Sequence, residues 1–330
     1  MTQPIPFPQQ NPEGYATVNE TIRYDAAEHL AFEFPEQIWT LADFGYSQKQ
    51  IDRCASPVAV TSPFRLLSEA GVEALHEIAT TMMAFCSRID GSRVPRHLAG
   101  GVYRSRFLRD LCNCPVILEH MSRIARTELL AHSMPSQQLY INYPPEDITR
   151  AVDAWHFDGI GFDYVLMASD PRQMKGGNFE YFKGTRDEVA AMFDLDVDQL
   201  RYGISDELPA DRVIKADFPA AGYAIFQQGN MIVHRAAKLL EAADRITLVP
   251  GMIAADFNYS DPTAKHDMPG YGEPGINVEL ARHSAWLAQA RLKQLIETLP
   301  MSSSDQLVET ALANAISDVV ESIQHIKTDT

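Results

Sequence analysis

The chain has 330 residues, with 28 Lys and Arg against 44 Asp and Glu, so its formal net charge is −16 at pH 7. This balance argues against a nucleic-acid-binding surface and against binding to anionic membranes, because both rely on clustered basic side chains. A hydrophobic content of 45% and a charged content of 22% are ordinary for a globular protein. The length allows one large domain or two small ones.

The compartment is predicted from the N-terminus and the cysteines. Residues 1–8 show no basic segment followed by an apolar run, so we expect no signal peptide. No apolar stretch approaches the roughly 20 residues of a membrane helix. Four cysteines are too few for a disulfide scaffold and indicate reduced thiols. We therefore expect a cytoplasmic protein with neither a membrane nor a nucleic acid as partner.

The first 135 residues predict a mainly helical support. Residues 1–20 are rich in Pro, Gln and Asn and predict an irregular arm. A helix is predicted from Ser68, a suitable N-cap, to Ile89. Its apolar residues recur at three- and four-residue spacing: Val72, Leu75, Ile78, Met82, Phe85 and Ile89. A second helical stretch, about residues 104–130, must break or restart at Pro115. We expect these helices to pack on the outside of a β core.

From residue 136 to residue 258 the period changes to that of β-strands. Alternating or β-branched runs bounded by Gly and Pro turns predict many short strands, which is typical of a sandwich or barrel. The predicted strands are 137–143, 154–158, 162–168, 178–182, 213–216, 223–227, 231–235 and 245–253. Residues 185–202 predict a helical insertion between strands, a candidate lid.

Residues 259–330 predict a Pro- and Gly-rich linker or active-site loop, followed by two helices. The helices, about 278–299 and 305–326, each have a narrow apolar stripe. Such stripes suit a helical hairpin against the barrel or a homodimer contact. With residues 1–135 as helical support and residues 136–258 as core, we interpret the whole chain, 1–330, as a single catalytic domain.

One motif in the β region has the composition of a metal site. His156 and Asp158 are two residues apart, so on a strand their side chains leave the same face. His234 ends a later strand-like run, and two His with one carboxylate form the facial triad of non-haem Fe(II) oxygenases. Arg245 and Thr247, again two apart, follow and can hold a carboxylate. A His-x-Asp alone is more often a core His beside a turn-forming Asp, and it is the ordered combination that is specific.

This pattern resembles the iron(II)/2-oxoglutarate-dependent oxygenase superfamily over about residues 136–258. The phytanoyl-CoA-hydroxylase-like and prolyl-hydroxylase-like branches are the nearest in style. Gly176 to Glu180 is similar to the Gly-Gly strand that follows the first motif in many of these enzymes. The resemblance implies an α+β fold with a mainly β core, a double-stranded β-helix (jelly roll, cupin-like), with N-terminal helices packed on the barrel and a C-terminal helical pair.

The resemblance also implies the chemistry. Fe(II) would be held by His156, Asp158 and His234, while Arg245 and Thr247 would bind the distal carboxylate of the cosubstrate 2-oxoglutarate. With O2, 2-oxoglutarate is decarboxylated to succinate and CO2 as an unactivated C–H bond of a small metabolite, such as an amino acid or a natural-product intermediate, is hydroxylated or otherwise oxidised. The presence of Asp158 disfavours halogenation and leaves desaturation, ring closure and epimerisation open.

Further site residues are predicted from alternation and from position. Tyr140 and Asn142 are candidates to bind 2-oxoglutarate, with plain barrel lining as the alternative. The candidates for substrate binding are Gln138, Phe162, Tyr164 and Arg104. Strand packing explains the two aromatic residues equally well, and a solvated helix face explains Arg104 better.

Two other readings of the same residues stay open. A cupin-like metal isomerase, hydrolase or dioxygenase would use no 2-oxoglutarate and would not need Arg245, although cupins usually have more His ligands. A sensor or binding protein on the same fold, with or without metal, would use the C-terminal helices as its interaction surface. Turnover of 2-oxoglutarate distinguishes the three readings.

Overall fold

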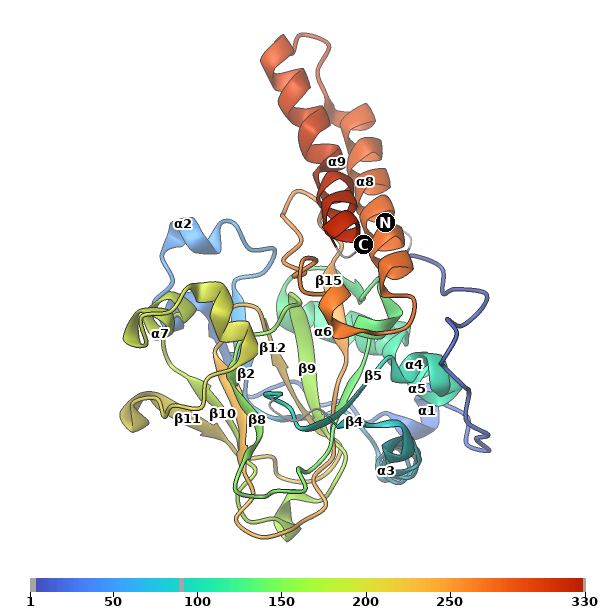
Figure 1. The fold of residues 1–330 in the computed structure, drawn as a ribbon, viewed down its shortest axis with the longest axis vertical. Helices are drawn as coiled ribbons and strands as arrows, with labels where there is room; N and C mark the ends of the chain where they lie inside the picture. Colours follow the sequence, from blue (N-terminus) through green and yellow to red (C-terminus); the bar gives the residue numbers. More distant parts are fainter. Residues whose placement is uncertain (1–3, 89–91, 329–330) are drawn as a thin grey trace.

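Two antiparallel sheets form the centre of the computed structural model, which describes residues 4–88 and 92–328 (Figure 1). The larger sheet has the order β1 (Ile38–Thr40), β2 (Val58–Thr61), β12 (Tyr223–Gln227), β9 (Phe162–Met167), β14 (Thr247–Val249), β7 (Tyr140–Asn142), β5 (Arg96–Ala99) and β4 (Ser87–Arg88). Three further strands belong to this sheet but lie off this order: β3 (Phe64–Arg65), β6 (Leu129–Ala131) and β15 (Gly251–Ala254). The smaller sheet has the order β11 (Val213–Ala216), β10 (Phe179–Phe182), β13 (His234–Lys238) and β8 (Ala151–His156).

The chain changes sheet at almost every step from β7 to β14. β7, β9, β12 and β14 lie in the larger sheet, whereas β8, β10, β11 and β13 lie in the smaller one. Each sheet therefore collects strands that are not consecutive in sequence, and residues far apart in the chain become neighbours. His156 pairs with His234 in this way, across β8 and β13.

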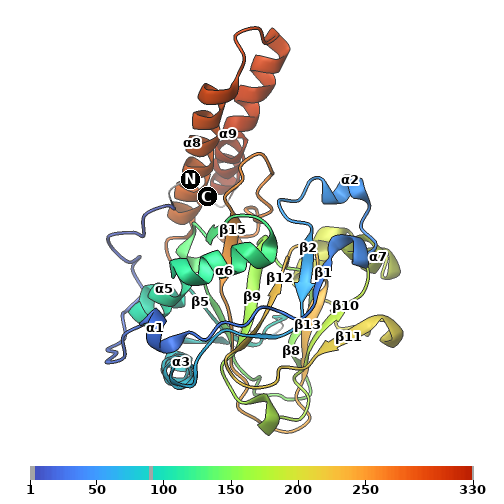
Figure 2. The same cartoon turned by 180° about the vertical axis from the view of Figure 1, so that it is seen from behind.

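Short helices cover the face of the larger sheet that is turned away from the smaller one (Figure 2). They are α1 (Ala26–His29), α3 (Glu69–Met82), α4 (Gly101–Arg104), α5 (Arg106–Cys112) and α6 (Pro115–Ala125). Their apolar faces and the facing side chains of β7, β9, β12 and β14 form the largest core cluster. Leu75, Leu108, Ile141, Leu166 and Phe226 are among its fully buried members. Burial of this apolar surface is the main stabilising contribution to the sheet.

The N-terminal helices differ in extent from the prediction. Ser68 is an N-cap, since its side chain accepts a hydrogen bond from the Gly71 amide, but α3 ends at Met82. The 3₁₀ turn Met83–Phe85 and β4 follow, and the predicted end at Ile89 lies outside the described residues. Pro115 restarts a helix at its N1 position as expected. Six strands, β1 to β6, lie in a region predicted as helical support, because pairing with distant strands overrides local propensity.

Three strand predictions need correction. The predicted strand 231–235, with His234 near its end, is β13, which begins at His234 and ends at Lys238, because residues 229–231 form a turn. The predicted strand 137–143 is shorter, because Pro135–Gln137 forms a 3₁₀ turn and the helical backbone continues at Gln138. The predicted strand 245–253 is two strands, β14 and β15, on either side of Pro250. The predicted helical insertion 185–202 consists of α7 (Arg186–Met192) and the 3₁₀ helix Val197–Tyr202. The short helix α2 (Gln48–Ile51) lies beside α7, where Gln50 donates to Asp187.

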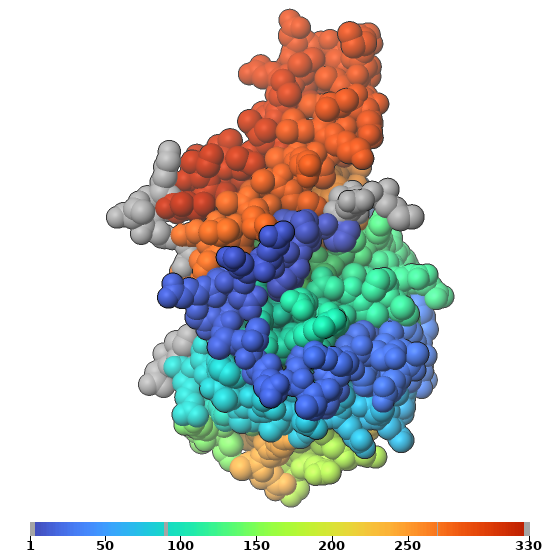
Figure 3. Space-filling view, turned by 90° about the vertical axis from the view of Figure 1, so that its right-hand side faces the viewer, coloured from blue at the N-terminus to red at the C-terminus, as the bar shows by residue number. Residues whose placement is uncertain are grey.

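The two C-terminal helices form a hairpin that projects from one end of the sheets (Figure 3). They are α8 (Ile276–Thr298) and α9 (Asp305–Thr328), which pack along each other. The hairpin reading of these helices is thus observed, whereas the homodimer contact stays a prediction. An apolar stripe of α9 is exposed: Leu312, Ile316, Val320 and Ile323. None of the helices in the described part of the chain is both long and apolar enough to cross a lipid bilayer.

Candidate active site

His156, Asp158 and His234 come together between the two sheets. His156 ends β8 and His234 begins β13 directly opposite, with ring centroids 4.3 Å apart. Asp158 lies just beyond β8 and reaches both rings: its Oδ1 is 3.2 Å from His156 Nε2 and its Oδ2 is 3.4 Å from His234 Nε2. One ligand atom from each residue lies within 4.8 Å of the other two. The predicted ligands therefore form one group that can hold a metal ion.

The backbone orients both imidazoles for metal binding. His156 Nδ1 lies 2.7 Å from the Ala154 carbonyl oxygen, and His234 Nδ1 lies 2.9 Å from the Ile232 carbonyl oxygen. A carbonyl only accepts, so each Nδ1 carries the proton and donates it. Each Nε2 then has a free lone pair directed at Asp158. Metal-ligating histidines are usually fixed by such a bond from the other ring nitrogen.

The residues behind the triad bring several acceptor atoms together, which calls for a cation at the triad, a proton on Asp163, or both. The Gln227 amide nitrogen has two hydrogens but three acceptors near it: Asp163 Oδ1 at 2.9 Å, Asp158 Oδ2 at 3.2 Å and His234 Nε2 at 3.2 Å. The other oxygen of Asp163 is buried and has no hydrogen-bond partner. A Cβ at Gly229 would overlap with both carboxylates, so only glycine allows this approach. A surplus of converging acceptors fits a cation at the triad.

Proton affinities in the group also favour metal binding at neutral pH. Burial lowers the pKa of His234 to about 4, so its imidazole is neutral. Burial alone would raise the pKa of Asp158, but the neighbouring His234 and His156 lower it below its usual range. Burial and the nearby Asp158 raise the pKa of Asp163 well above its usual range. The group thus presents one ionised carboxylate and at least one neutral imidazole, as divalent metals require.

A β-bulge brings a further carboxylate to the triad. His156 pairs with His234 and Asp153 with Ala236, so three residue steps on β8 oppose two on β13. The extra residue lets Asp153 face the same side as His156, although their separation of three would place them on opposite faces of a regular strand. Asp153 Oδ1 lies 3.4 Å from His156 Nδ1 and 2.5 Å from Arg93 Nη1. Neither Asp153 nor Arg93 could be recognised as a site residue from the alternation of side chains along a regular strand.

Arg245 is a buried guanidinium that has no counter-ion among the residues that the structure describes. It is 1% exposed, and its Nε donates to the Gly177 carbonyl at 2.7 Å. Its Nη1 is 3.5 Å from Thr247 Oγ1, at the limit of a hydrogen bond. Within the described residues, no carboxylate oxygen lies within 4.0 Å of it, as Arg245 forms no ion pair there. Burial lowers its pKa to about 10, which leaves it charged at neutral pH. An unpaired buried charge is costly, which fits an anionic ligand.

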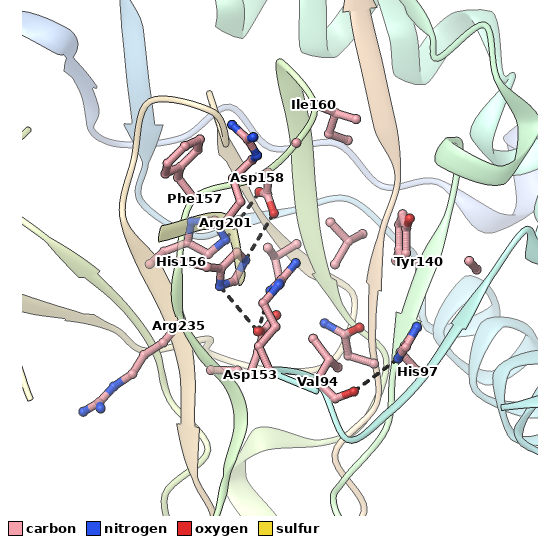
Figure 4. A pocket seen from close by; sticks show the side chains of 18 of the residues that line it. Val94, His97, Tyr140, Asp153, His156, Phe157, Asp158, Ile160, Arg201 and Arg235 are labelled. Atoms are coloured by element: carbon pink, nitrogen blue, oxygen red, sulfur yellow. Dashed lines mark hydrogen bonds and ion pairs between the residues drawn. The ribbon is translucent and has the colours of Figure 1, made fainter. Parts of the chain in front are cut away.

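The triad and Arg245 line the same cavity, of about 480 Å³, between the sheets (Figure 4). Thr247, Tyr140 and Asn142, the other predicted cosubstrate residues, line it too. Asn142 is paired in register with Thr247, which places their side chains in one row across β7 and β14. The Tyr140 hydroxyl donates to Gln137 Oε1 at 3.2 Å. Their roles toward 2-oxoglutarate stay predictions.

The four predicted substrate residues do not line this cavity. Phe162 and Tyr164 alternate with Asp163 along β9, so they point into the helix-covered core while Asp163 faces the triad. Gln138 is turned away from the cavity by the 3₁₀ turn and is buried, and its amide donates to the His132 carbonyl at 2.8 Å. Arg104, at the end of α4, lies over the Tyr15 and Phe85 rings. These four assignments are corrected: the residues are structural.

The mouth of the cavity, where Tyr202 is 61% exposed, is lined by residues that the sequence did not single out. Arg201 and Tyr202, at the end of the insertion, both line the cavity. Arg201 Nε donates to Asp267 Oδ2 at 2.8 Å, and the Tyr202 hydroxyl donates to Asp267 Oδ1 at 2.7 Å. The insertion and the loop after β15 are therefore tied together beside the triad. Of this arrangement, the sequence indicated residues 185–202 as a candidate lid and the stretch from residue 259 as a linker or active-site loop, but not the bonds between them.

No protein-family model and no curated protein matches the chain. Among solved structures, it is similar to the non-haem alpha-ketoglutarate-dependent carbocyclase SnoK from nogalamycin biosynthesis, with 15% identity, a TM-score of 0.45 and coverage of 72% of this chain and 95% of that chain. It is also similar to the non-haem alpha-ketoglutarate-dependent epimerase SnoN from the same biosynthesis, with 14% identity, a TM-score of 0.44 and coverage of 65% of this chain and 84% of that chain. A third similar structure is HygX from Streptomyces hygroscopicus, solved with nickel, 2-oxoglutarate and hygromycin B bound. Here the identity is 12%, the TM-score is 0.36, and 63% of this chain and 87% of that chain are covered.

The structural neighbours of the chain thus include non-haem 2-oxoglutarate-dependent enzymes, the class that the sequence resembles. At these identities and TM-scores the likeness carries no conclusion about activity. The function has to follow from the residues of the cavity itself.

Proposed function

We propose that this chain is a non-haem Fe(II)/2-oxoglutarate-dependent oxygenase that oxidises a C–H bond of a small polar metabolite. The observation that supports it most strongly is the shared cavity: a His-Asp-His group and a buried, unpaired Arg245 face the same enclosed space. We also propose that the alternation of β7 to β14 between two sheets is that of a double-stranded β-helix, or jelly roll.

Each of these residues has a definite task in such an enzyme. His156, Asp158 and His234 would hold the iron, which together with 2-oxoglutarate and O2 supplies the oxidising power for an unactivated C–H bond. Arg245 would bind the distal carboxylate of 2-oxoglutarate through its planar guanidinium, and Thr247 would donate its hydroxyl proton to the same group. Because Gly177 and Thr247 fix the Arg245 side chain, the carboxylate would be held in one place.

The protein would also exclude water from the reaction. His156, His234 and Arg245 are almost fully buried and Asp158 is partly buried, and the insertion and the loop after β15 are bonded to each other beside them. A dry cavity strengthens the interaction between Arg245 and a carboxylate and protects a reactive centre from side reactions.

The proposal can be tested without knowing the substrate. Purified apoprotein is mixed anaerobically with Fe(II), titrated with 2-oxoglutarate and followed by the visible metal-to-ligand charge-transfer band. We expect a saturable band in the wild type and none in His156→Ala. In Arg245→Ala the 2-oxoglutarate concentration for half-saturation should rise about 10- to 100-fold, because a hydrogen-bonded charge contributes about 1.5–3 kcal/mol.

Two exposed residues provide matched controls. His76→Ala and Arg172→Ala remove the same side-chain types from the surface, so both should give the wild-type band. Absence of the band in the wild type, with iron bound according to metal analysis, would contradict the use of 2-oxoglutarate. A cupin-like metalloenzyme or a binding protein would then be the better description.

A further inference from the structure

The charges on the cavity wall almost cancel in pairs. Three of its arginines are each within ion-pair distance of a carboxylate: Arg93 with Asp153 at 2.5 Å, Arg201 with Asp267 at 2.8 Å, and Arg235 with Glu180 at 2.8 Å. Asp158 belongs to the metal group. Among the described lining residues, this leaves one cation and one anion without a charged partner: Arg245, already proposed to bind 2-oxoglutarate, and Glu273.

Glu273 is held in place at the cavity wall with one oxygen free. It lies between the 3₁₀ turn Pro269–Tyr271 and α8 and is half-buried. The Tyr15 hydroxyl donates to its Oε2 in a short hydrogen bond. Tyr15 is itself 5% exposed and packs against Tyr103, at 4.7 Å between ring centroids, so this donor cannot move freely. In the described part of the chain, neither a hydrogen bond nor an ion pair involves Glu273 Oε1.

Contacts place Glu273 at the β5 and β7 end of the cavity. Tyr15, which donates to Glu273, lies against Gly100, and the preceding Ala99 pairs with Tyr140. His97 of β5 and Tyr140 of β7 line the same cavity as Glu273, and its charge acts on both. Figure 4 shows His97 and Tyr140 across the cavity from His156 and Asp158. Burial lowers the pKa of His97, so its imidazole is neutral at neutral pH.

Arg93 and Tyr271 also lie at this end of the cavity, but neither neutralises the charge of the Glu273 carboxylate. The Arg93 guanidinium also acts on His97, but Asp153 neutralises it. The Tyr271 ring lines the cavity two residues before Glu273. A carboxylate beside electron-rich rings, with no cation of its own, fits an ammonium group better than a neutral or anionic one.

We propose that Glu273 anchors a cationic amine of the substrate, so that this enzyme acts on small polar amines. The ammonium would bind at the Glu273 end of the cavity, while the C–H bond to be oxidised lies at the metal end. Tyr15 is a positioning residue, which orients the carboxylate through Oε2 and leaves Oε1 for the ligand. This inference deepens the proposed oxygenase function and rests on it.

The test compares matched probes that differ only at nitrogen. Glucosamine, glucose and N-acetylglucosamine form one set, and 4-aminocyclohexanol with 1,4-cyclohexanediol forms another. Binding to the wild type loaded anaerobically with Fe(II) and 2-oxoglutarate is measured by saturation-transfer NMR and by perturbation of the visible band. We expect each amine to bind about tenfold or more tightly than its neutral counterpart, and Glu273→Gln to abolish this preference.

Two further variants make the result specific to this carboxylate. Glu146→Gln removes an exposed carboxylate and should keep the preference for amines. Tyr15→Phe keeps the charge but removes the orienting bond, so it should weaken the preference without abolishing it. Equal binding of amines and neutral counterparts, failure of every amine to bind, or a preference that survives in Glu273→Gln would each overturn the proposal. The wild-type band formed without any amine reports separately on the oxygenase function.

Discussion

At the scale of single residues, Gln227 determines how the carboxylate ligand is presented. Its amide donates toward Asp158 and Asp163 from the strand behind the triad. Removing this donor would free Asp158 to rotate away from the two imidazoles and would leave Asp163 without a partner.

Gln227→Ala should therefore weaken metal binding about 10- to 100-fold, the usual effect of losing a group that orients a metal ligand. Titration of the apoprotein with Co(II), followed by its visible absorption, measures this affinity. Gln173→Ala, in an exposed 3₁₀ turn, should bind as the wild type does. An unchanged affinity in Gln227→Ala would mean that the backbone alone positions Asp158.

His132 is a second residue whose environment has a measurable consequence. It is 1% exposed, its Nδ1 accepts from the Met134 amide at 3.2 Å and its Nε2 donates to Thr263 Oγ1 at 3.1 Å. Burial lowers its pKa from 6.5 to about 3, and the neighbouring His283 contributes to the shift, whereas Asp261 opposes it and Lys265 adds to it. The folded protein thus keeps His132 neutral.

Because the unfolded chain binds this proton below about pH 6.5 and the folded chain does not, His132 lowers the free energy of unfolding as the pH falls. The change is about 1.4 kcal/mol for each pH unit until the pH nears 3, and there is none above about 7. His132→Gln should reduce the slope of unfolding free energy against pH by about 1.4 kcal/mol per pH unit between pH 4.5 and 6, which is the value for one proton. Urea unfolding of the metal-free protein at several pH values measures the slope, with His76→Gln as the exposed control. An unchanged slope would show that His132 is protonated in the folded state.

At the scale of elements, Asp267 joins two segments that are far apart in sequence. The 3₁₀ helix Val197–Tyr202 and the loop after β15 meet only through side chains here, with Asp267 accepting from Arg201 and Tyr202. Arg201 also reaches the exposed Asp198 and His266. The connection is buried on the Asp267 side, where the carboxylate is 3% exposed.

Asp267→Ala should open the mouth of the cavity, because it leaves the Arg201 guanidinium buried without its main partner, at a local cost of about 3–5 kcal/mol. Limited trypsin digestion should then cleave after Arg201 at least about tenfold faster than in the wild type. Asp198→Ala removes the exposed partner, 65% accessible, and should leave cleavage slow. Equal rates in the Asp267 variant and the wild type would show that packing alone holds the insertion.

At the scale of the whole molecule, a buried ion cluster fastens the helical hairpin to the β body. Lys265, in the loop after β15, is 4% exposed and lies 2.7 Å from Asp318 and 3.2 Å from Glu321, both on α9. Asp318 also binds Arg291 of α8 in a short ion pair. The hairpin otherwise projects from the sheets, as Figures 1 and 3 show. This cluster is one of the contacts at its base, together with the buried hydrogen bonds of Glu279 and His283 on α8.

Lys265→Ala should lower the free energy of unfolding by about 3–5 kcal/mol, since it leaves buried carboxylates without their central cation. Urea unfolding followed by circular dichroism gives this value. Lys175→Ala, where the ammonium is 69% exposed, should change it by less than about 1 kcal/mol. If the two variants were equally stable, the apolar contacts and the hydrogen bonds of Glu279 and His283 would be enough to hold the hairpin on the body.

The sequence by itself determined the features that depend on residue type and short spacing. The identity and order of His156, Asp158 and His234 were readable because two strands place alternate side chains on one face. Arg245 and Thr247 followed from the same rule. The cap at Ser68, the restart at Pro115 and the two C-terminal helices also depend only on neighbours within a few residues.

Only the tertiary structure decided which distant residues share the cavity. The bulge in β8 brings Asp153 beside His156 and thereby recruits Arg93. A single 3₁₀ turn removes Gln138 from the cavity, and Glu273 reaches it from the start of the hairpin. Register, bulges and burial depend on pairing between segments that are far apart in the chain, and a local pattern contains no information about that pairing.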